Sequence, residues 1–197
     1  MPRYAMVIQR DLCTGCQTCV VACKMENLTM PGCSRTIVKE GPNGEWDIAG
    51  CMQCAKPPCV TGCPAGATWQ DQSGITLVDE EKCRGSECGA CVEACPYGAR
   101  KLNPKQGYFA VPVPYEEVAR KLKVKHKVHT PGKVDKCDFC AHRLKANKLP
   151  LCVEACTTLA RVFGDMDDPK SDVSRLLAKG AKPKNADWGT EPRVFYI

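Results

Sequence analysis

The stretch Cys13-Thr-Gly-Cys-Gln-Thr-Cys-Val-Val-Ala-Cys23 places four cysteines at gaps of two, two and three residues. Three cysteines at this spacing on a tight loop can wrap one cubane cluster, each thiolate binding a different iron. The fourth cysteine starts the helix that leaves the loop, so its thiolate points toward a second cluster. The spacing therefore predicts that cysteine groups act in pairs and exchange their fourth ligands.

Cysteine is abundant in this chain, at 17 of 197 residues, and only Cys33 lies outside a group. Group one holds Cys13, Cys16, Cys19 and Cys23; group two holds Cys51, Cys54, Cys59 and Cys63; group three holds Cys83, Cys88, Cys91 and Cys95; group four holds Cys137, Cys140, Cys152 and Cys156. Four groups form two pairs and predict four [4Fe-4S] clusters. Pro64 and Pro96, which follow the last cysteines of groups two and three, fit the Cys-Pro ending of bacterial ferredoxin motifs.

Two other uses of cysteine compete with this interpretation. Structural zinc prefers two C-x2-C pairs on separate turns, which group four alone could provide but groups one to three do not. A disulfide scaffold usually needs a secretion signal, and residues 1–10 show none. Cysteines this close in sequence also make poor disulfide partners. A zinc-loaded structural or interaction protein stays as the alternative of a different class.

Charge and hydropathy limit the partners. The formal net charge of +6 counts cysteines as neutral, and four clusters with their thiolates would add about −8. A nucleic-acid partner is therefore not predicted. No stretch approaches the roughly 18 apolar residues of a membrane span, so any membrane contact is expected through another subunit. No catalytic Ser/His/Asp constellation, carboxylate pair or phosphate-binding glycine motif appears, and direct substrate binding is not predicted.

The pattern between the cysteines predicts a loop-rich α+β fold of short strands and helices. We expect a strand at 4–9, a helix at 19–28, a loop-rich link at 29–50 and a hairpin at 67–78. Residues 51–103 then form one ferredoxin-like module. Groups one and four must pair around it, so 1–50 with 134–164 form a second, discontinuous module related to the first by pseudo-symmetry.

The remaining segments are an insertion and a tail. Within the insertion at 104–133, the pattern predicts a helix at 114–122 and a lysine-rich edge strand at 121–128. The other interpretation of these lysines is a docking patch for an acidic partner. The histidines of the insertion, His126 and His129, are expected to be solvated, and His142 to be a surface or capping residue. The polar tail at 165–197 is predicted to contact another subunit.

The cysteine segments, together with RYAMVIQRD (3–11), ACPYGAR (94–100) and RVFGDMDDP (161–169), resemble the four-cluster iron–sulfur subunit of the dimethyl sulfoxide reductase family of molybdopterin oxidoreductases. The likeness is strongest to the electron-transfer subunit of polysulfide and thiosulfate reductases. It covers nearly the whole chain. The resemblance implies a large catalytic partner with molybdenum or tungsten on a pterin, and in many cases a membrane subunit that handles quinone. The alternative is that the same electron-transfer subunit serves a hydrogenase or a formate-oxidising complex. The resemblance also implies either a cytoplasmic location or export in the folded state with a twin-arginine partner.

The resemblance further implies the ligand sets of the four clusters. Set one is Cys13, Cys16, Cys19 and Cys156; set two is Cys23, Cys137, Cys140 and Cys152; set three is Cys51, Cys54, Cys59 and Cys95; set four is Cys63, Cys83, Cys88 and Cys91. In the family, the first cluster lies nearest the catalytic subunit. One departure concerns Cys83, which four residues separate from Cys88 instead of the usual two. If Cys83 does not bind iron, the fourth cluster would be [3Fe-4S].

Overall fold

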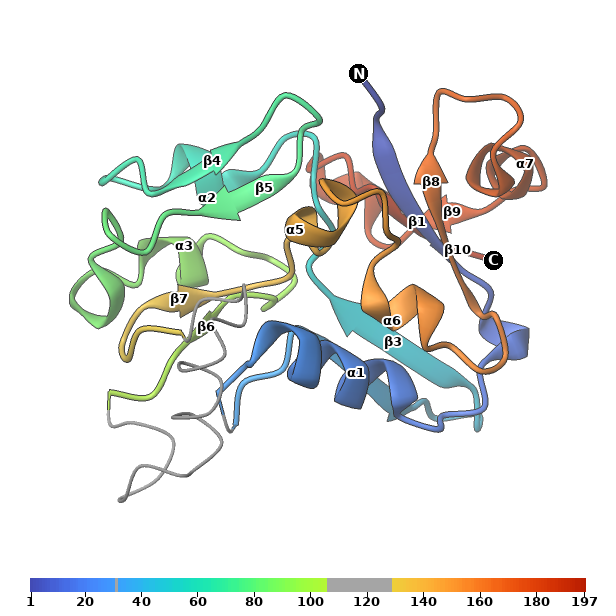
Figure 1. Cartoon of the computed structure of the whole chain (residues 1–197), viewed down its shortest axis with the longest axis horizontal. Helices are drawn as coiled ribbons and strands as arrows, with labels where there is room; N and C mark the ends of the chain where they lie inside the picture. The colour runs from blue at the N-terminus through green and yellow to red at the C-terminus, as the bar shows by residue number, and fades with distance from the viewer. Residues whose placement is uncertain (31, 106–128) are drawn as a thin grey trace.

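The computed structural model describes residues 1–30, 32–105 and 129–197 (Figure 1). Its elements are short: α1 (Thr18–Asn27), the longest described helix, has 10 residues, and the described strands have at most five. This mixture of short helices and strands fits the predicted α+β class. The predicted helix at 114–122 and strand at 121–128 lie outside the described residues.

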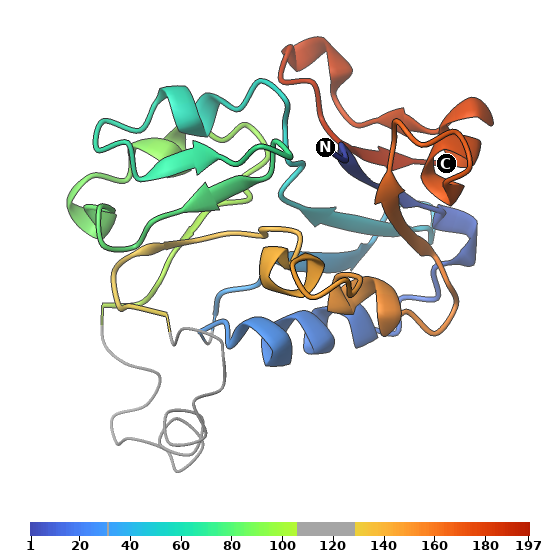
Figure 2. The ribbon, with the colours of Figure 1, turned by 45° about the horizontal axis from the view of Figure 1, so that its top comes forward.

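A four-stranded sheet joins both ends of the chain. Its order is β8 (Arg161–Asp165), β1 (Tyr4–Ile8), β10 (Val194–Tyr196) and β9 (Lys182–Pro183). β1 runs antiparallel to β8 and parallel to β10, with Met6 opposite both Phe163 and Val194. In Figure 2 the dark blue β1 lies among the orange and red strands. Residues 165–197, predicted as a tail, therefore contribute strands to the sheet that contains β1; their predicted subunit contact stays a prediction.

The predicted strand at 4–9 is confirmed, and its side chains alternate between two cores. Ala5 and Val7 pack with Val173 of α7 (Asp172–Ala178) on one face of the sheet. Met6 and Ile8 face the main hydrophobic core. All four are almost fully buried, which explains why β1 reads as a continuous apolar run.

The link at 29–50, predicted to be loop-rich, is instead largely a β-hairpin. β2 (Thr36–Glu40) pairs antiparallel with β3 (Trp46–Gly50), and Val38 and Ile48 face each other in the main core. The turn is closed by a hydrogen bond from the Gly41 N–H to the Glu45 carbonyl, at 2.7 Å. The loop prediction was wrong because the glycines of GPNGEW belong to the turn of this hairpin.

The second region contains the hairpin that the sequence predicted at 67–78. β4 (Thr68–Gln70) pairs antiparallel with β5 (Thr76–Val78). The Asp71 carboxylate accepts hydrogen bonds from the backbone of Ser73 and Ile75, both at 2.9 Å, which fixes the turn. β6 (Lys101–Leu102) pairs with β7 (Val134–Asp135) and brings the start of group four beside group three.

Short helices and turns carry many of the cysteines. The predicted helix at 19–28 is confirmed as α1, which packs against α6 (Leu151–Glu154). Besides α7, the other described helices are α2 (Pro58–Thr61), α3 (Ala90–Glu93) and α5 (Ala141–Leu144). The described 3-10 turns are η1 (Arg10–Leu12), η2 (Gly85–Glu87) and η3 (Ala186–Trp188). None of the helices described in these ranges is long and apolar enough to cross a membrane.

Candidate metal centres

Cysteines of groups two and three meet in one cavity. Its lining includes Cys51, Cys54 and Cys59 from group two and Cys95 from group three. Pro58 sits at the first position of α2, where its missing N–H costs no hydrogen bond, and so α2 begins directly before Cys59. The fold thus brings together the four cysteines of set three, three from one loop and the fourth from another.

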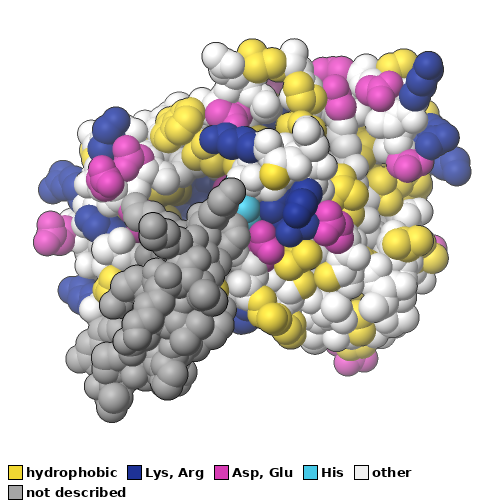
Figure 3. All heavy atoms as spheres, in the orientation of Figure 1, with side chains coloured by type: hydrophobic (Ala, Val, Ile, Leu, Met, Phe, Trp, Pro, Cys, Tyr) yellow, Lys and Arg dark blue, Asp and Glu magenta, His cyan; other side chains and the backbone are white. Residues whose placement is uncertain are grey.

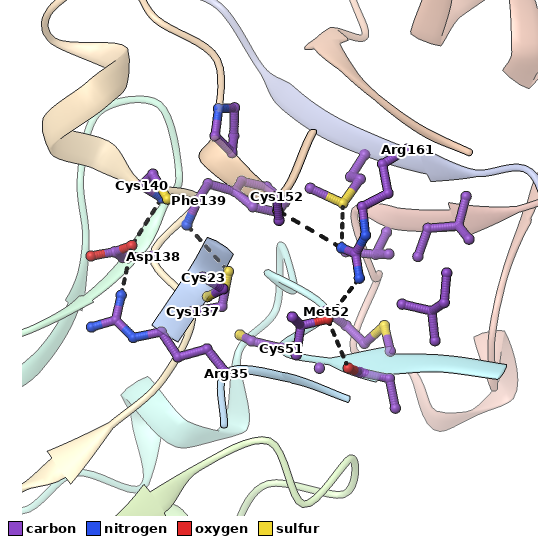
Figure 4. Close-up of a pocket in the computed structure, with 18 of the residues that line it drawn as sticks. Cys23, Arg35, Cys51, Met52, Cys137, Asp138, Phe139, Cys140, Cys152 and Arg161 are labelled. Carbon is purple, nitrogen blue, oxygen red and sulfur yellow. Dashed lines mark hydrogen bonds and ion pairs between the residues drawn. The ribbon is translucent and has the colours of Figure 1, made fainter. Parts of the chain in front are cut away.

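A second cavity brings together the cysteines of set two (Figure 4). Cys23 comes from α1, Cys152 from α6, and Cys137 and Cys140 from the loop between β7 and α5. Burial raises the pKa of Cys23 to about 12 and that of Cys140 to about 11. Cys51 also lines this cavity, so sets two and three are neighbours.

The cysteines of set four lie in a smaller hydrophobic cluster. Cys83 and Cys91 are buried there, and half-buried Cys63 packs against them. Burial raises the pKa of Cys91 most, and the nearby Cys63 and Cys83 raise it further. Cys88, at the end of η2, is half-buried, and neither that cluster nor the cavities described above include it.

The two additional residues before Cys88 have a defined structure. Residues 85–87 form η2, and the Ser86 N–H donates to the Gly132 carbonyl at 2.9 Å. The Gly85 N–H lies 3.3 Å from the Cys83 sulfur, and Lys133 donates to the Cys83 carbonyl. The longer loop therefore keeps Cys83 buried and beside Cys91.

Set one is the most exposed part of the site. Cys16 is exposed and Cys13 half-buried, whereas Cys19 is buried. The Cys16 sulfur lies 3.8 Å from the hydroxyl of Thr157, which follows Cys156 in the chain. Hydrogen bonds from the hydroxyl and backbone of Thr18 lower the pKa of Cys16 to about 7. An indole ring also fixes this loop: Gly15 has φ +70°, and a Cβ there would overlap Trp46.

The cysteine loops turn backbone donors toward sulfur. Left-handed residues occur in all four groups, among them Gln17, Gln53, Gly89 and Phe139. Such conformations form concave arrays of N–H groups that bind anions, including iron–sulfur clusters. The Phe139 N–H lies 3.4 Å from the Cys137 sulfur. These features fit the negative charge of a thiolate-bound cluster.

Sites for a single metal ion and sites for a cubane cluster differ in how far apart their ligands stand. Within residues 1–30, 32–105 and 129–197, no three His, Cys, Asp or Glu side chains are close enough to hold one metal ion. Four ligands of a cubane bind different irons at its corners and therefore stand farther apart than four ligands of one tetrahedral ion.

Two buried arginines near the thiols were not foreseen. Arg100 lines the cavity of set three and Arg161 that of set two. The sequence signal was available, because both arginines stand five residues after the last cysteine of a group.

The other residues singled out by sequence have mixed outcomes. His129 is buried, with its Nε2 2.8 Å from the Asn27 carbonyl, so the expectation of solvation was wrong; its acceptors lie on other segments. His126 lies outside the described residues. Cys33 is buried, with its sulfur 3.6 Å from the Leu102 carbonyl and apart from both cysteine-lined cavities.

His142 is half-buried, and its Nε2 lies 2.8 Å from Oε1 of Glu26. The other oxygen of Glu26, Oε2, lies 3.3 Å from Nη1 of Arg143. Figure 3 shows side chains of both charges beside a histidine on the face that it draws. His142 therefore has a carboxylate partner at this surface.

Comparison with known proteins agrees with the donor set. Residues 43–111 and 113–166 match the family model of the 4Fe-4S dicluster domain. The arrangement and the match together define an iron–sulfur protein. This protein belongs to the 4Fe-4S dicluster family, and the predicted iron–sulfur chemistry is confirmed at that level.

Several curated relatives cover nearly the whole chain. The B subunit of tetrathionate reductase from Salmonella typhimurium is 39% identical, over 99% of this chain and 72% of its own length. The arsenate respiratory reductase iron–sulfur subunit of Shewanella sp. is 37% identical, over 99% of this chain and 96% of its own. The B component of polysulfide reductase from Wolinella succinogenes is 34% identical, over 99% and 94%. The predicted resemblance to the iron–sulfur subunits of such reductases is confirmed, and it is favoured over a hydrogenase or formate-oxidising complex.

Proposed function

We propose that this chain is the electron-transfer subunit of a respiratory reductase, with four [4Fe-4S] clusters held by its sixteen grouped cysteines. Each cluster would supply a one-electron carrier. The chain's own part is to hold the thiolates, exclude water from the inner sets and surround the sulfurs with donors. The relatives named above support this role, since each is an iron–sulfur or B component of a reductase.

The observation that carries the proposal is the cavity lined by Cys51, Cys54, Cys59 and Cys95. Three thiols from one group and the last thiol of another is the exchange that a two-cluster ferredoxin needs. The second cavity supports the same scheme. Here the later group supplies three thiols, Cys137, Cys140 and Cys152 of group four, and the earlier group supplies its last thiol, Cys23 of group one.

We further propose the full ligand scheme and module division. Set one would be Cys13, Cys16, Cys19 and Cys156, and set four would be Cys63, Cys83, Cys88 and Cys91. One module would comprise 1–50 with 134–164 and the other 51–103, related by pseudo-symmetry. The burial of Cys83 beside Cys91 supports four irons, rather than three, in the fourth cluster.

The proposed partners are a large catalytic subunit with molybdenum or tungsten on a pterin and a membrane subunit that exchanges electrons with quinone. The exposed Cys16 loop supports contact of set one with the catalytic partner, because electron transfer needs close approach at an accessible end.

The decisive experiment is anaerobic purification of the native complex with metal analysis per copy of this chain. About 16 irons in this chain, with molybdenum or tungsten in a large co-purifying subunit, is the expected result. About 15 would point to a three-iron fourth cluster. Zinc without iron would overturn the proposal.

A matched pair of variants tests the ligand exchange. Cys95→Ser should lose between one and four irons of set three, whereas Cys33→Ser should keep the full iron content, because Cys33 is a buried thiol that lies outside the cavity. Equal iron in the two variants would contradict the scheme.

A further inference from the structure

Two arginines occupy matching positions in the two halves of the cysteine pattern. Arg100 ends Cys95-Pro-Tyr-Gly-Ala-Arg and Arg161 ends Cys156-Thr-Thr-Leu-Ala-Arg. Only 2% of Arg100 and 6% of Arg161 is exposed. Arginine is almost never buried to this degree without a compensating group, because its guanidinium stays charged.

Arg161 reaches the sulfurs of two cysteine sets. Its Nη2 donates to the Thr36 hydroxyl at 2.7 Å, and its Nη1 lies 3.8 Å from the Cys152 sulfur of set two. Cys19 of set one is also near enough to raise the pKa of the Arg161 guanidinium, as Cys152 does. Figure 4 shows its side chain directed into the cavity toward Cys152.

Arg100 has the same environment in the other half. Its Nη1 donates to the Thr68 hydroxyl at 3.1 Å. Its guanidinium interacts with Cys59 of set three and with Cys91 of set four. It also lines the cavity of set three. A threonine hydroxyl thus holds each arginine, and each arginine interacts with at least one thiol from each of two sets.

Neither guanidinium has a carboxylate counter-ion within residues 1–30, 32–105 and 129–197. Among the described residues no Asp or Glu forms an ion pair with Arg100 or Arg161. In the described part of the chain, Nε and Nη2 of Arg100 and Nε of Arg161 are buried and have no hydrogen-bond partner. By contrast, the buried Arg35 binds two aspartates. The anions left to balance Arg100 and Arg161 are the thiolates and the clusters they hold.

We propose that Arg100 and Arg161 are shared counter-ions, each of which sets the reduction potentials of two clusters at once: Arg161 those of sets one and two, and Arg100 those of sets three and four. The inference rests on the proposed function, because it needs the clusters. A cation favours the more negative, reduced form of a cluster and so raises its potential. Burial keeps this interaction strong, because salt and water screen it little.

The test is a redox titration, followed by EPR, of the complete complex purified anaerobically. In Arg161→Met, the equilibrium constant for reduction should fall at least tenfold for two of the four clusters. This corresponds to a fall in reduction potential of at least 59 mV for one electron. In Arg100→Met, the other two should fall. This reciprocal result needs no assignment of individual signals, and each variant is the matched control for the other.

Arg161→Lys and Arg100→Lys keep a cation while losing the fork that reaches two sulfurs. Their potentials should fall less, on the same pairs, and these variants provide the test if a methionine variant loses iron. Shifts of the same clusters in both arginine variants, or unshifted potentials with full iron in the methionine and lysine variants, would overturn the inference. A wild-type complex without clusters would instead refute the proposed function.

Discussion

Gly85→Ala tests the reasoning about the longer loop of group three. Gly85 is buried with φ +61°, and a Cβ there would overlap the carbonyl oxygen of Gly132, whose carbon lies 3.0 Å away. The left-handed conformation costs a non-glycine residue about 1–2 kcal/mol. Displacing Gly132 also breaks its hydrogen bond from Ser86, and leaving a buried group unpaired costs about 1–3 kcal/mol more.

Gly66→Ala is the matched control, since Gly66 has φ +58° with nothing within 4 Å of the added methyl. It should carry the conformational cost alone. For a chain of this size, 1 kcal/mol shifts the midpoint of thermal unfolding by about 2–4 °C. Anaerobic thermal scans at one heating rate should therefore place Gly85→Ala about 5 °C or more below Gly66→Ala. Equal midpoints would show that the 85–87 turn is not fixed on Gly132.

Three further perturbations follow from described contacts. His129→Gln should cost about 2 kcal/mol near pH 5.5, the size of a hydrogen bond to a charged group, and less above pH 8, measured by denaturation across pH. The pKa of His129 is raised, so its contribution to stability is full below pH 6.5 and is lost as the pH rises. The pKa of Glu80 is lowered to about 2, so its contribution to stability is full above pH 4.5 and is lost as the pH falls. Cys83→Ser should reduce the iron content by one to four and alter one EPR signal; an unchanged spectrum would exclude Cys83 as a ligand. Tyr196→Phe removes a 2.9 Å hydrogen bond to the Ile48 carbonyl and should cost about 1 kcal/mol without moving any cluster potential.

The cysteine spacing predicted groups that pair and exchange their fourth ligands, and the resemblance to reductase iron–sulfur subunits supplied the ligand sets, which stay predictions. The cavities of sets two and three bring together the predicted residues. What sequence did not predict was the counter-charge. Arg100 and Arg161 both stand five residues after the last cysteine of a group, but that spacing alone does not show that they are buried beside sulfur.

The fold was predictable where the signal was local. The hairpin at 67–78 has its turn residues and alternation within a dozen positions. The hairpin at 36–50 was missed although its pattern is equally local, because its polar, glycine-containing turn was interpreted as part of a loop. β10 was missed for another reason: its partner β1 lies at the other end of the chain, and parallel pairing at that distance leaves no local signature.

The pairing of β1 with β10 also orders events during synthesis. Met6 and Val194 are about 190 residues apart, so at 5–20 residues per second about 10–40 s pass between their appearance at the ribosome. Cys51 and Cys95, by contrast, can meet much earlier. The segment that carries Cys54 is nevertheless completed late, because the Arg193 N–H donates to the Met52 carbonyl and the Ala55 N–H to the Glu191 carbonyl. Until then one edge of β1 is unpaired and open to other strands. Closure of the sheet that contains β1 and β10 should therefore be a late step, and it should also complete the loop around Cys54.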